Sequence, residues 1–498
     1  MLKGGDSLVD ALLSGITQLL TPIYILMFSL GTIIGLFFGI LPGLDGVTGL
    51  ALLLPFVFML EKKAALALIL GMSAISFTAG AITSILLGAP GTSGSTATIM
   101  DGFPMAKKGL AGKAIGAAIT ASIFGGVFGA VVLSLTIPIF KPLVLMFGSA
   151  EFLAMTILGI SLVAVLCGEK PLRGITSAGV GILISQIGAD PIMGLYRWTF
   201  GITYLQQKIS VVLVALGLFA LAEIIDMAIQ GMPISTRQST QGKFDGVLET
   251  FKNWKLTLSS SFIGAVTGFM PGLGSAVACW ISYALAMITC KPKDQFGKGD
   301  IRGVIAPEAA NNASLGGALI PTIAFGIPGG TLMALLLSAF WMIGLRPGPE
   351  MLRRNLDIVY LIIWTIALSN IIGGIILLIW TDKFAKIAMI RIEILAPIIT
   401  LVIFLGAVIT NMNIWDLWVV FGFCLLGWVM KKINWPRPPL LMGFILGPLI
   451  ERFYFTTMMV FGEKWVMRPM VLIILLMAVF FLIIGYKTVR NARKPSNR

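Results

Sequence analysis

Four Pro-Gly pairs lie inside strongly apolar runs of this sequence, where helix breakers are unexpected. They are Pro42-Gly43, Pro90-Gly91, Pro271-Gly272 and Pro328-Gly329. Proline removes a backbone N–H and ends a helix, so each pair frees carbonyls before it and N–H groups after it. Freed N–H groups at a helix start favour an anion, and freed carbonyls can coordinate a cation. The pairs therefore predict a binding site for a negatively charged solute with a cation near it.

Small and hydroxyl residues follow these pairs, in "APGTSGSTAT", "PGLGS" and "PGGT". Hydroxyl groups donate hydrogen bonds to carboxylates without burying a charge. The alternative role of any single Ser or Thr is close packing between helices. For the set as a whole we predict substrate binding by Pro42, Gly43, Leu44, Pro90, Gly91, Thr92, Ser93, Pro271, Gly272, Ser275, Pro328, Gly329 and Thr331.

Three further polar residues are candidates for binding a coupling ion, either Na⁺ or a proton. Asp45 follows Pro42 in an apolar context, and a charge at membrane depth is costly and often functional. Its alternative role is to cap the start of a helix. Asn311 and Asn312 offer amide oxygens to a cation, with hydrogen bonding between helices as the alternative. Asp101, in "IMDGFP", is expected on a loop.

Composition excludes several kinds of chemistry. The sequence has no histidine, and its four cysteines, Cys167, Cys279, Cys290 and Cys424, form no C-x-x-C pair. It contains no Walker A motif, and "PGLD" has no aspartate counterpart in the second half for an intramembrane aspartyl protease. We therefore predict neither an enzyme nor a tightly bound cofactor. The net charge of +14 fits basic cytoplasmic loops of a membrane protein rather than binding to nucleic acid.

The elements that must position these residues are apolar helices. The 498 residues are 57% hydrophobic and 12% charged. Apolar runs recur along the chain, and we count about 10–14 transmembrane segments among them, several of which are short or broken. The expected fold is an all-α, multi-pass membrane protein. The tail after Tyr486 carries five basic residues and no acid, which places it in the cytoplasm. The clearest runs are 23–41, 114–140, 213–229, 359–380 and 471–486.

Ordered matches between the two halves indicate an internal duplication. Pro42 and its neighbours recur around Pro271, an offset of 229, and Pro90 recurs as Pro328, an offset of 238. "EFLA" at Glu151 recurs as "EILA" at Glu393. We predict a first membrane repeat at 1–230, a polar linker at 231–255 and a second repeat with the basic tail at 256–498. Many secondary transporters have inverted repeats whose broken helices, or re-entrant hairpins, meet near the bilayer midplane.

Four stretches carry a resemblance to a known family: "GILPGLDGVTGLALLLPF", "ILLGAPGTSGSTATIMDGFPMAKKG", "FGKGDIRGVIAPEAANNASLGGALIPTIAFGIPGG" and "GLRPGPEML". Together they resemble the large membrane subunit, TctA, of tripartite tricarboxylate transporters. The resemblance implies ion-coupled import of carboxylates across a bacterial inner membrane. It also implies a small TctB-like membrane subunit and a periplasmic TctC-like solute-binding protein. Asp45 and Gly88 depart from the family pattern, which expects a small or hydroxyl residue and an Asn there.

The function predicted from the sequence is secondary active import of di- or tricarboxylates such as citrate, coupled to Na⁺ or H⁺. Alternating access, of the elevator type, is the expected movement. A stand-alone anion permease or channel is the main alternative, although few charges line the apolar segments. A membrane scaffold without transport would leave the paired helix breaks without a purpose.

Overall fold

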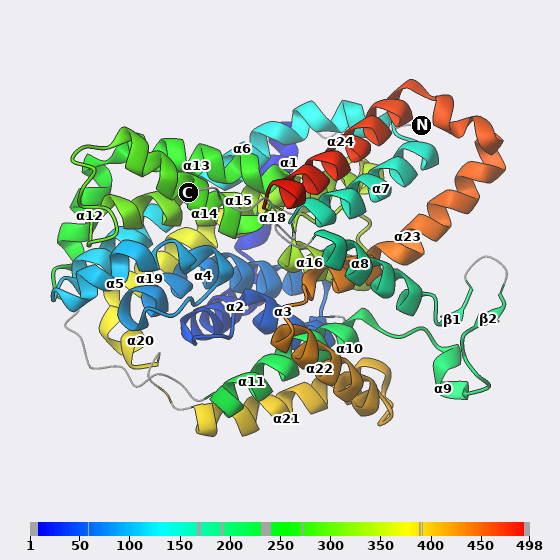
Figure 1. Cartoon of the computed structure of the whole chain (residues 1–498), viewed down its shortest axis with the longest axis horizontal. Coiled ribbons are helices and arrows are strands. Elements are labelled where there is room, and N and C mark those ends of the chain that lie inside the picture. Colours follow the sequence, from blue (N-terminus) through cyan, green and yellow to red (C-terminus); the bar gives the residue numbers. More distant parts are fainter. Residues whose placement is uncertain are drawn as a thin grey trace.

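The computed structural model is a bundle of helices with one short strand pair projecting from it (Figure 1). It describes residues 8–57, 59–166, 171–190, 194–230, 241–270, 273–387, 390 and 392–492. The all-α class predicted from the sequence is confirmed. Within the described ranges, seven helices are long and apolar enough to cross a membrane. Five shorter apolar helices accompany them, and three of these five follow a helix break.

The helices and strands divide between the two halves of the chain. The first half contains α1 (Leu8–Leu19), α2 (Pro22–Ile40), α3 (Gly46–Val57), α4 (Lys62–Leu87), η1 (Ser93–Thr96), α5 (Ile99–Lys107), α6 (Ala111–Leu145), α7 (Ser149–Leu166), α8 (Pro171–Ser185), β1 (Gly188–Ala189), β2 (Tyr196–Arg197), α9 (Thr203–Gln206), α10 (Val211–Ala215), η2 (Leu216–Leu221) and α11 (Ala222–Gln230). The second half contains α12 (Lys243–Lys252), α13 (Trp254–Phe269), α14 (Gly274–Thr289), α15 (Arg302–Phe325), α16 (Thr331–Met342), α17 (Pro349–Arg354), α18 (Leu356–Leu368), η3 (Ser369–Gly373), α19 (Gly374–Ile379), α20 (Thr381–Ile387), α21 (Ile392–Asn411), α22 (Asp416–Lys432), α23 (Pro438–Phe461), η4 (Gly462–Met467) and α24 (Pro469–Ala492).

Glycines bring α2 and α4 into backbone contact along their length. A Cβ on Gly35 would lie 2.4 Å from the Met72 carbonyl oxygen, and a Cβ on Gly39 would lie 2.6 Å from that of Ser76. The residue numbers rise together, so the two helices run parallel. Small residues permit this close approach, which drives helix association where no water is present.

The same contact recurs between α13 and α15 in the second half. A Cβ on Gly264 would lie 2.3 Å from the Ala310 carbonyl oxygen, and one on Gly268 would lie 2.2 Å from that of Ser314. Gly264 stands 229 residues after Gly35, and Ala310 stands 238 after Met72. The offsets found in the sequence therefore relate the packing of these two helix pairs as well.

The two helix pairs point in opposite directions. Asp101, which follows the end of α4, accepts hydrogen bonds from the backbone at Gly299 and Asp300, just before α15 begins. At the other end of α4, a Cβ on Gly344, which follows α16, would lie 3.6 Å from the Lys62 Nζ, and the nearby Gly348 N–H donates to the Ile323 carbonyl at the end of α15. Helix α4 and helix α15 are therefore antiparallel, as inverted repeats require.

Two long helices contain a π-helical segment in their middle. The span Val211–Ile229 includes η2, and the span Leu356–Ile379 includes η3. A π segment widens the helix and exposes a carbonyl to a side-chain donor, and such segments are frequent at functional sites. In this protein both segments accept hydrogen bonds from distant side chains: the Leu218 carbonyl of η2 accepts from Arg437, and the Asn370 Oδ1 of η3 accepts from Asn312.

The segment predicted as a linker is largely helical where it is described. Residues 231–240 lie outside the described ranges, α12 covers Lys243–Lys252, and α13 begins at Trp254. Helix α12 packs against the start of α6, where a Cβ on Gly246 would lie 2.0 Å from the Lys113 carbonyl oxygen. Glycine is needed at this crossing because the facing atoms belong to the backbone.

Candidate functional site

A cavity of about 560 Å³ lies where the helix breaks of both halves meet. Residues 43, 45–48, 90–93, 273–276 and 329–333 contribute to its wall, together with residues from η2, α11 and the start of α23. Ligand sites in transporters of this construction form where discontinuous helices face each other. Residues of three of the four Pro-Gly pairs thus line one cavity, and residues 273–276, which follow the fourth pair on the chain, line it as well.

The first break separates α2 from α3. The Leu44 N–H donates to the Leu41 carbonyl in a tight turn, and Gly43 adopts φ +82°, which side chains with a Cβ rarely tolerate. The Ile40 carbonyl, left without a helical partner where α2 ends, accepts a 2.5 Å hydrogen bond from the Thr83 hydroxyl of α4. Helix α2 therefore ends at the cavity with this carbonyl satisfied by a neighbouring helix.

Asp45 caps the helix that follows this break. Its Oδ1 accepts hydrogen bonds from the backbone N–H groups of Val47, at 3.0 Å, and Thr48, at 3.2 Å. The capping role that the sequence left open is thus present, and Asp45 also lines the cavity. Its role in ion coupling remains a prediction.

The second break brings the chain back along α4. Helix α4 ends at Leu87, and Gly88 closes it in the left-handed region with φ +64°. Gly91 then packs against Gly80, where a Cβ on Gly91 would lie 2.6 Å from the Gly80 Cα. The return positions Thr92, Ser93 and Pro90 in the cavity wall.

The break after α15 repeats this geometry. Gly326 closes α15 with φ +67°, 238 residues after Gly88, and Gly329 packs against Ala318 of the same helix. Helix α16 then begins at Thr331, with no side chain capping its first N–H groups. The remaining break falls on Pro271 and Gly272, which lie outside the described residues. Helix α14 begins directly after it, at Gly274.

The predicted substrate-binding residues divide into three groups. Eight of them line the cavity: Gly43, Pro90, Gly91, Thr92, Ser93, Ser275, Gly329 and Thr331. Three are buried and do not belong to its lining: Pro42, Leu44 and Pro328. Pro271 and Gly272 form the third group, for which the structure gives no position.

Asn311 and Asn312 lie inside the bundle and bond to neighbouring helices. The Asn312 Nδ2 donates to the Thr78 hydroxyl at 2.7 Å and to the Asn370 Oδ1 at 2.6 Å. The Asn311 Nδ2 reaches the Phe77 carbonyl at 3.5 Å, while its Oδ1 is buried without a hydrogen-bond partner. The interhelical bonding left open by the sequence is present, and binding of a cation stays a prediction.

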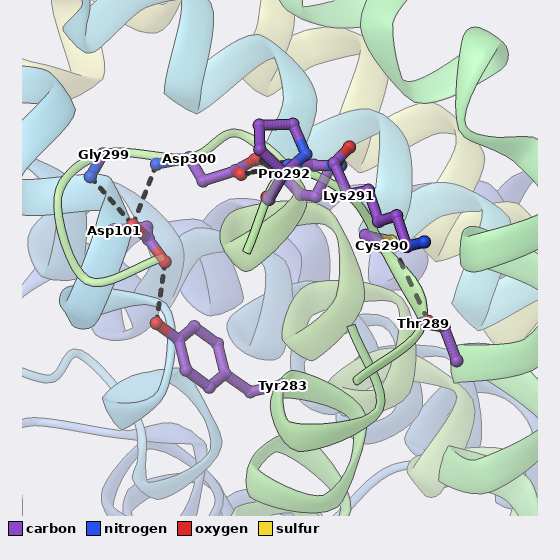
Figure 2. A network of polar contacts seen from close by, with 9 residues as sticks. Asp101, Tyr283, Thr289, Cys290, Lys291, Pro292, Gly299 and Asp300 are labelled. Carbon is purple, nitrogen blue, oxygen red and sulfur yellow. Dashed lines mark hydrogen bonds and ion pairs between the residues drawn. The ribbon is translucent and has the colours of Figure 1, made fainter. Parts of the chain in front are cut away.

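Asp101 was expected on a loop, and that prediction is wrong. Asp101 lies in the first turn of α5 and is fully buried. Its Oδ1 accepts from the backbone N–H groups of Gly299 and Asp300, both at 2.8 Å, and its Oδ2 accepts from the Tyr283 hydroxyl, also at 2.8 Å (Figure 2). These partners come from a segment almost 200 residues away, so the local sequence could not indicate them.

Arg437 is the cavity residue that sequence reasoning missed. It stands in "PRPP" directly before α23, and its guanidinium lines the cavity. Its Nη1 donates to the Leu218 carbonyl at 3.0 Å, and both Nη atoms lie 3.3 Å from the Glu223 Oε2. An arginine between prolines before an apolar run was the available signal. Arg437 therefore adds a positive charge to the hydrogen-bond donors that the helix starts and hydroxyl groups supply at the cavity.

Charges behind Arg437 form a partly buried network. Lys431 lies 2.8 Å from a Glu223 oxygen and 2.7 Å from an Asp226 oxygen, and Lys432 lies 3.0 Å from Asp226. Glu223 therefore has a second basic partner besides Arg437. These ion pairs hold Glu223 in place. If Arg437 turned toward a ligand, Glu223 would keep Lys431 as its partner.

The fold and the cavity define an all-α, multi-pass membrane protein in which interrupted helices from both parts of the chain line one cavity. The Tripartite tricarboxylate transporter TctA family matches residues 25–442, and the chain belongs to that family.

Two relatives come from Agrobacterium vitis. One, the uncharacterized 52.8 kDa protein in the TAR-I ttuC' 3'region, is 30% identical over 454 residues, which cover 89% of each chain. The other, an uncharacterized protein in the TAR-II ttuC' 3'region, is 33% identical over 188 residues, covering 38% of this chain and 78% of that one. No solved structure matches the chain.

Proposed function

We propose that this protein imports di- or tricarboxylates across a bacterial inner membrane by ion-coupled secondary transport. The observation that carries the proposal is the shared cavity, into which the helix breaks of both halves and Arg437 project. Family membership supports a component of a tripartite tricarboxylate transporter. The residues of the cavity wall also support a substrate class, a coupling ion and a transport movement, which are proposed in turn below.

The cavity wall offers two kinds of group that bind a carboxylate. Arg437 supplies a planar guanidinium with several donors, the side chain best suited to paired carboxylate oxygens. Helices α14 and α16 begin at the wall, so their first N–H groups add positive potential. The hydroxyls of Thr92, Ser93, Ser275 and Thr331 complete the donor set.

Ion coupling follows from the charges of the same wall. Its charged residues are Asp45, Glu223 and Arg437, which sum to one negative charge. A substrate with two or three negative charges would face net repulsion unless a cation entered with it. We therefore propose co-transport of Na⁺ or H⁺, with Asp45, Asn311 and Asn312 as the cation-binding candidates found from the sequence.

The arrangement also supports two inverted repeats and alternating access. We propose that 1–230 and 256–498 are the repeats, joined by 231–255, because helix contacts in both halves obey the same offsets. The broken helices meet η2, α11 and the start of α23 at the cavity, where α3 contacts η2 and α16 contacts α23, and we take this contact as the boundary between two units. Sliding of the broken-helix unit along this boundary would be an elevator movement.

Membrane orientation is proposed from the basic residues at one end of the bundle. Lys108 donates to the Lys298 carbonyl there, and Lys113 pairs with Glu249 of α12. Helix α24 runs parallel to α7, since Arg468 and Glu151 pair near the starts of both, so it ends at this same side. By the positive-inside rule this end is cytoplasmic, and α12 lies there with the basic tail.

Uptake measurements test the proposal. Vesicles that contain this chain with a TctB-like subunit, and a TctC-like binding protein outside, are screened against citrate, succinate and other carboxylates under Na⁺ or pH gradients. Gradient-dependent uptake that requires the binding protein is expected. Carboxylate flux without that protein would favour a stand-alone permease or channel, and no flux of any carboxylate would contradict the proposal.

A further inference from the structure

Glu308 is a fully buried acid in the second turn of α15 and does not line the cavity. Its Oε1 accepts from the Thr98 hydroxyl at 2.5 Å, and its Oε2 accepts from the Ser122 hydroxyl at 3.1 Å. Among the described residues, no lysine or arginine forms an ion pair with it. An ionised carboxylate at such a depth is expensive without a compensating charge.

The donors of Glu308 distinguish it from the other buried acids near the helix breaks. Asp101 and Asp45 each accept from two backbone N–H groups, which can only donate (Figure 2 shows Asp101). The Thr98 and Ser122 partners of Glu308 are hydroxyls, which can donate to a carboxylate or accept from a carboxylic acid, and the Asn311 side chain is a further hydrogen-bond partner. The site of Glu308 can therefore hold either protonation state with its hydrogen bonds made.

The groups that face Glu308 from the packed helices are otherwise uncharged. Helix α6 presents Gly125 to the neighbouring Ala309, and α13 presents Gly264 to Ala310. Helix α14 contributes the Cys279 thiol, which donates to the Pro307 carbonyl, and this thiol is the titratable neighbour. Asp101 of α5 lies against Gly303, toward the start of α15. Helix α4 contributes Phe77 and Thr78, and η3 contributes Asn370, to the turn of α15 that follows Glu308.

A short path joins Glu308 to the cavity. Asn311 stands one helical turn beyond it, and the partnerless Asn311 Oδ1 faces Gly94, where a Cβ would lie 2.0 Å from that oxygen. The same Cβ would lie 2.8 Å from the Ser275 hydroxyl, which belongs to the cavity wall. Thr98, which donates to Glu308, follows on the chain the Pro90-Gly91 break that lines the cavity.

We propose that Glu308 is the binding site of a coupling proton, a role that rests on the proposed function. A proton from water on one side adds to the carboxylate, and the Thr98 or Ser122 hydroxyl turns from donor to acceptor. The loss of one negative charge beside the cavity favours entry of an anionic substrate. On release the proton passes to water on the other side, and the carboxylate forms again.

The first test needs no substrate. Infrared difference spectra of the purified full chain are recorded between acidic and alkaline pH for wild type, Glu308→Gln and the control Glu350→Gln, which changes an exposed acid of α17. A carboxylic acid C=O band that appears on acidification, is lost in Glu308→Gln and persists in the control is expected. A band unchanged by Glu308→Gln would overturn the proposal. Glu308→Asp, which should keep a titrating band, serves if the Gln variant does not fold.

The second test measures protons taken up when succinate binds, in weak buffer near neutral pH, where succinate is fully ionised. Wild type should take up about one proton per succinate, so that Kd rises about tenfold per pH unit, whereas Glu308→Gln should take up none. Succinate binding that requires Na⁺ and takes up no proton would overturn the proposal and leave the proposed function standing. If wild type binds none of the carboxylates, the proposed function fails and this coupling role fails with it.

Discussion

Gly91 and Gly80 are in backbone contact at the centre of the bundle, where a Cβ on Gly91 would lie 2.6 Å from the Gly80 Cα and 2.7 Å from its carbonyl oxygen. The counterpart pair, Gly329 and Ala318, stands 238 residues later, with a looser 3.0 Å from the Cβ site to the Ala318 Cβ. Backbone atoms cannot move aside as a flexible side chain can. These contacts fix the return of the chain after α4 and after α15, and thereby the position of the cavity wall.

Gly91→Ala is expected to destabilise the protein by about 1–3 kcal/mol, because the added methyl overpacks a site closed by backbone. Gly329→Ala should cost less, since its nearest neighbour lies 3.0 Å from the Cβ site rather than 2.6 Å. Thermal unfolding in detergent measures both. Gly422→Ala, in α22, is the control, because a Cβ there meets no atom within 4 Å. Equal stability of Gly91→Ala and the control would contradict the contact.

The Thr83–Ile40 hydrogen bond gives a second stability prediction. Thr83→Val keeps the shape of the side chain and leaves the Ile40 carbonyl buried without its donor. The expected loss is about 1–3 kcal/mol, the cost of an unsatisfied buried polar group. Thr410→Val is the matched control, since that hydroxyl bonds only within its own helix. Unfolding curves that coincide for the two variants would show that the Thr83 hydroxyl does not stabilise the Ile40 carbonyl at the break.

Arg437 leads to a prediction about substrate affinity. Arg437→Ala should raise the KM for carboxylate uptake about 10- to 100-fold, corresponding to the roughly 1.5–3 kcal/mol of a hydrogen bond to a charged group. The fold should survive, because Glu223 keeps Lys431 as a partner. Arg437→Lys should recover part of the loss, since it keeps the charge without the planar fork. An unchanged KM, as expected for the exposed Arg346→Ala, would remove Arg437 from the site.

Sequence patterns anticipated the breaks at Pro42, Pro90 and Pro328 and the long helices because those features depend on local chemistry. Proline and glycine end helices wherever they stand, and apolar runs of sufficient length cross membranes in any fold. Arg437 escaped prediction because its role depends on η2 and α11, more than 200 residues earlier in the chain. Asp101 was misplaced for the same reason, since the partners that bury it come from the segment before α15.

Asp45 can be tested separately as a cap and as an ion ligand. Asn also caps helices well, so Asp45→Asn should keep the stability of the protein, whereas Asp45→Ala should lose about 1 kcal/mol. With Glu308 as the proton site, uptake by Asp45→Asn should keep its dependence on pH. Initial rates across a range of pH and Na⁺ decide this. Loss of the ion dependence in Asp45→Asn would assign coupling to Asp45 instead.

Alternating access predicts that the cavity opens to each side of the membrane in turn. Ser93 and Thr331 line it from the two halves, so single Ser93→Cys and Thr331→Cys variants, made after replacing the four native cysteines, report on both. A membrane-impermeant thiol reagent should label each cysteine from either side, and bound substrate should slow the labelling. Thr136→Cys, on α6 and outside the cavity lining, should show no effect of substrate. If each of the two cavity positions reacts from one side alone under every ionic condition, the two halves do not exchange access, and the movement proposed for the broken-helix unit does not occur.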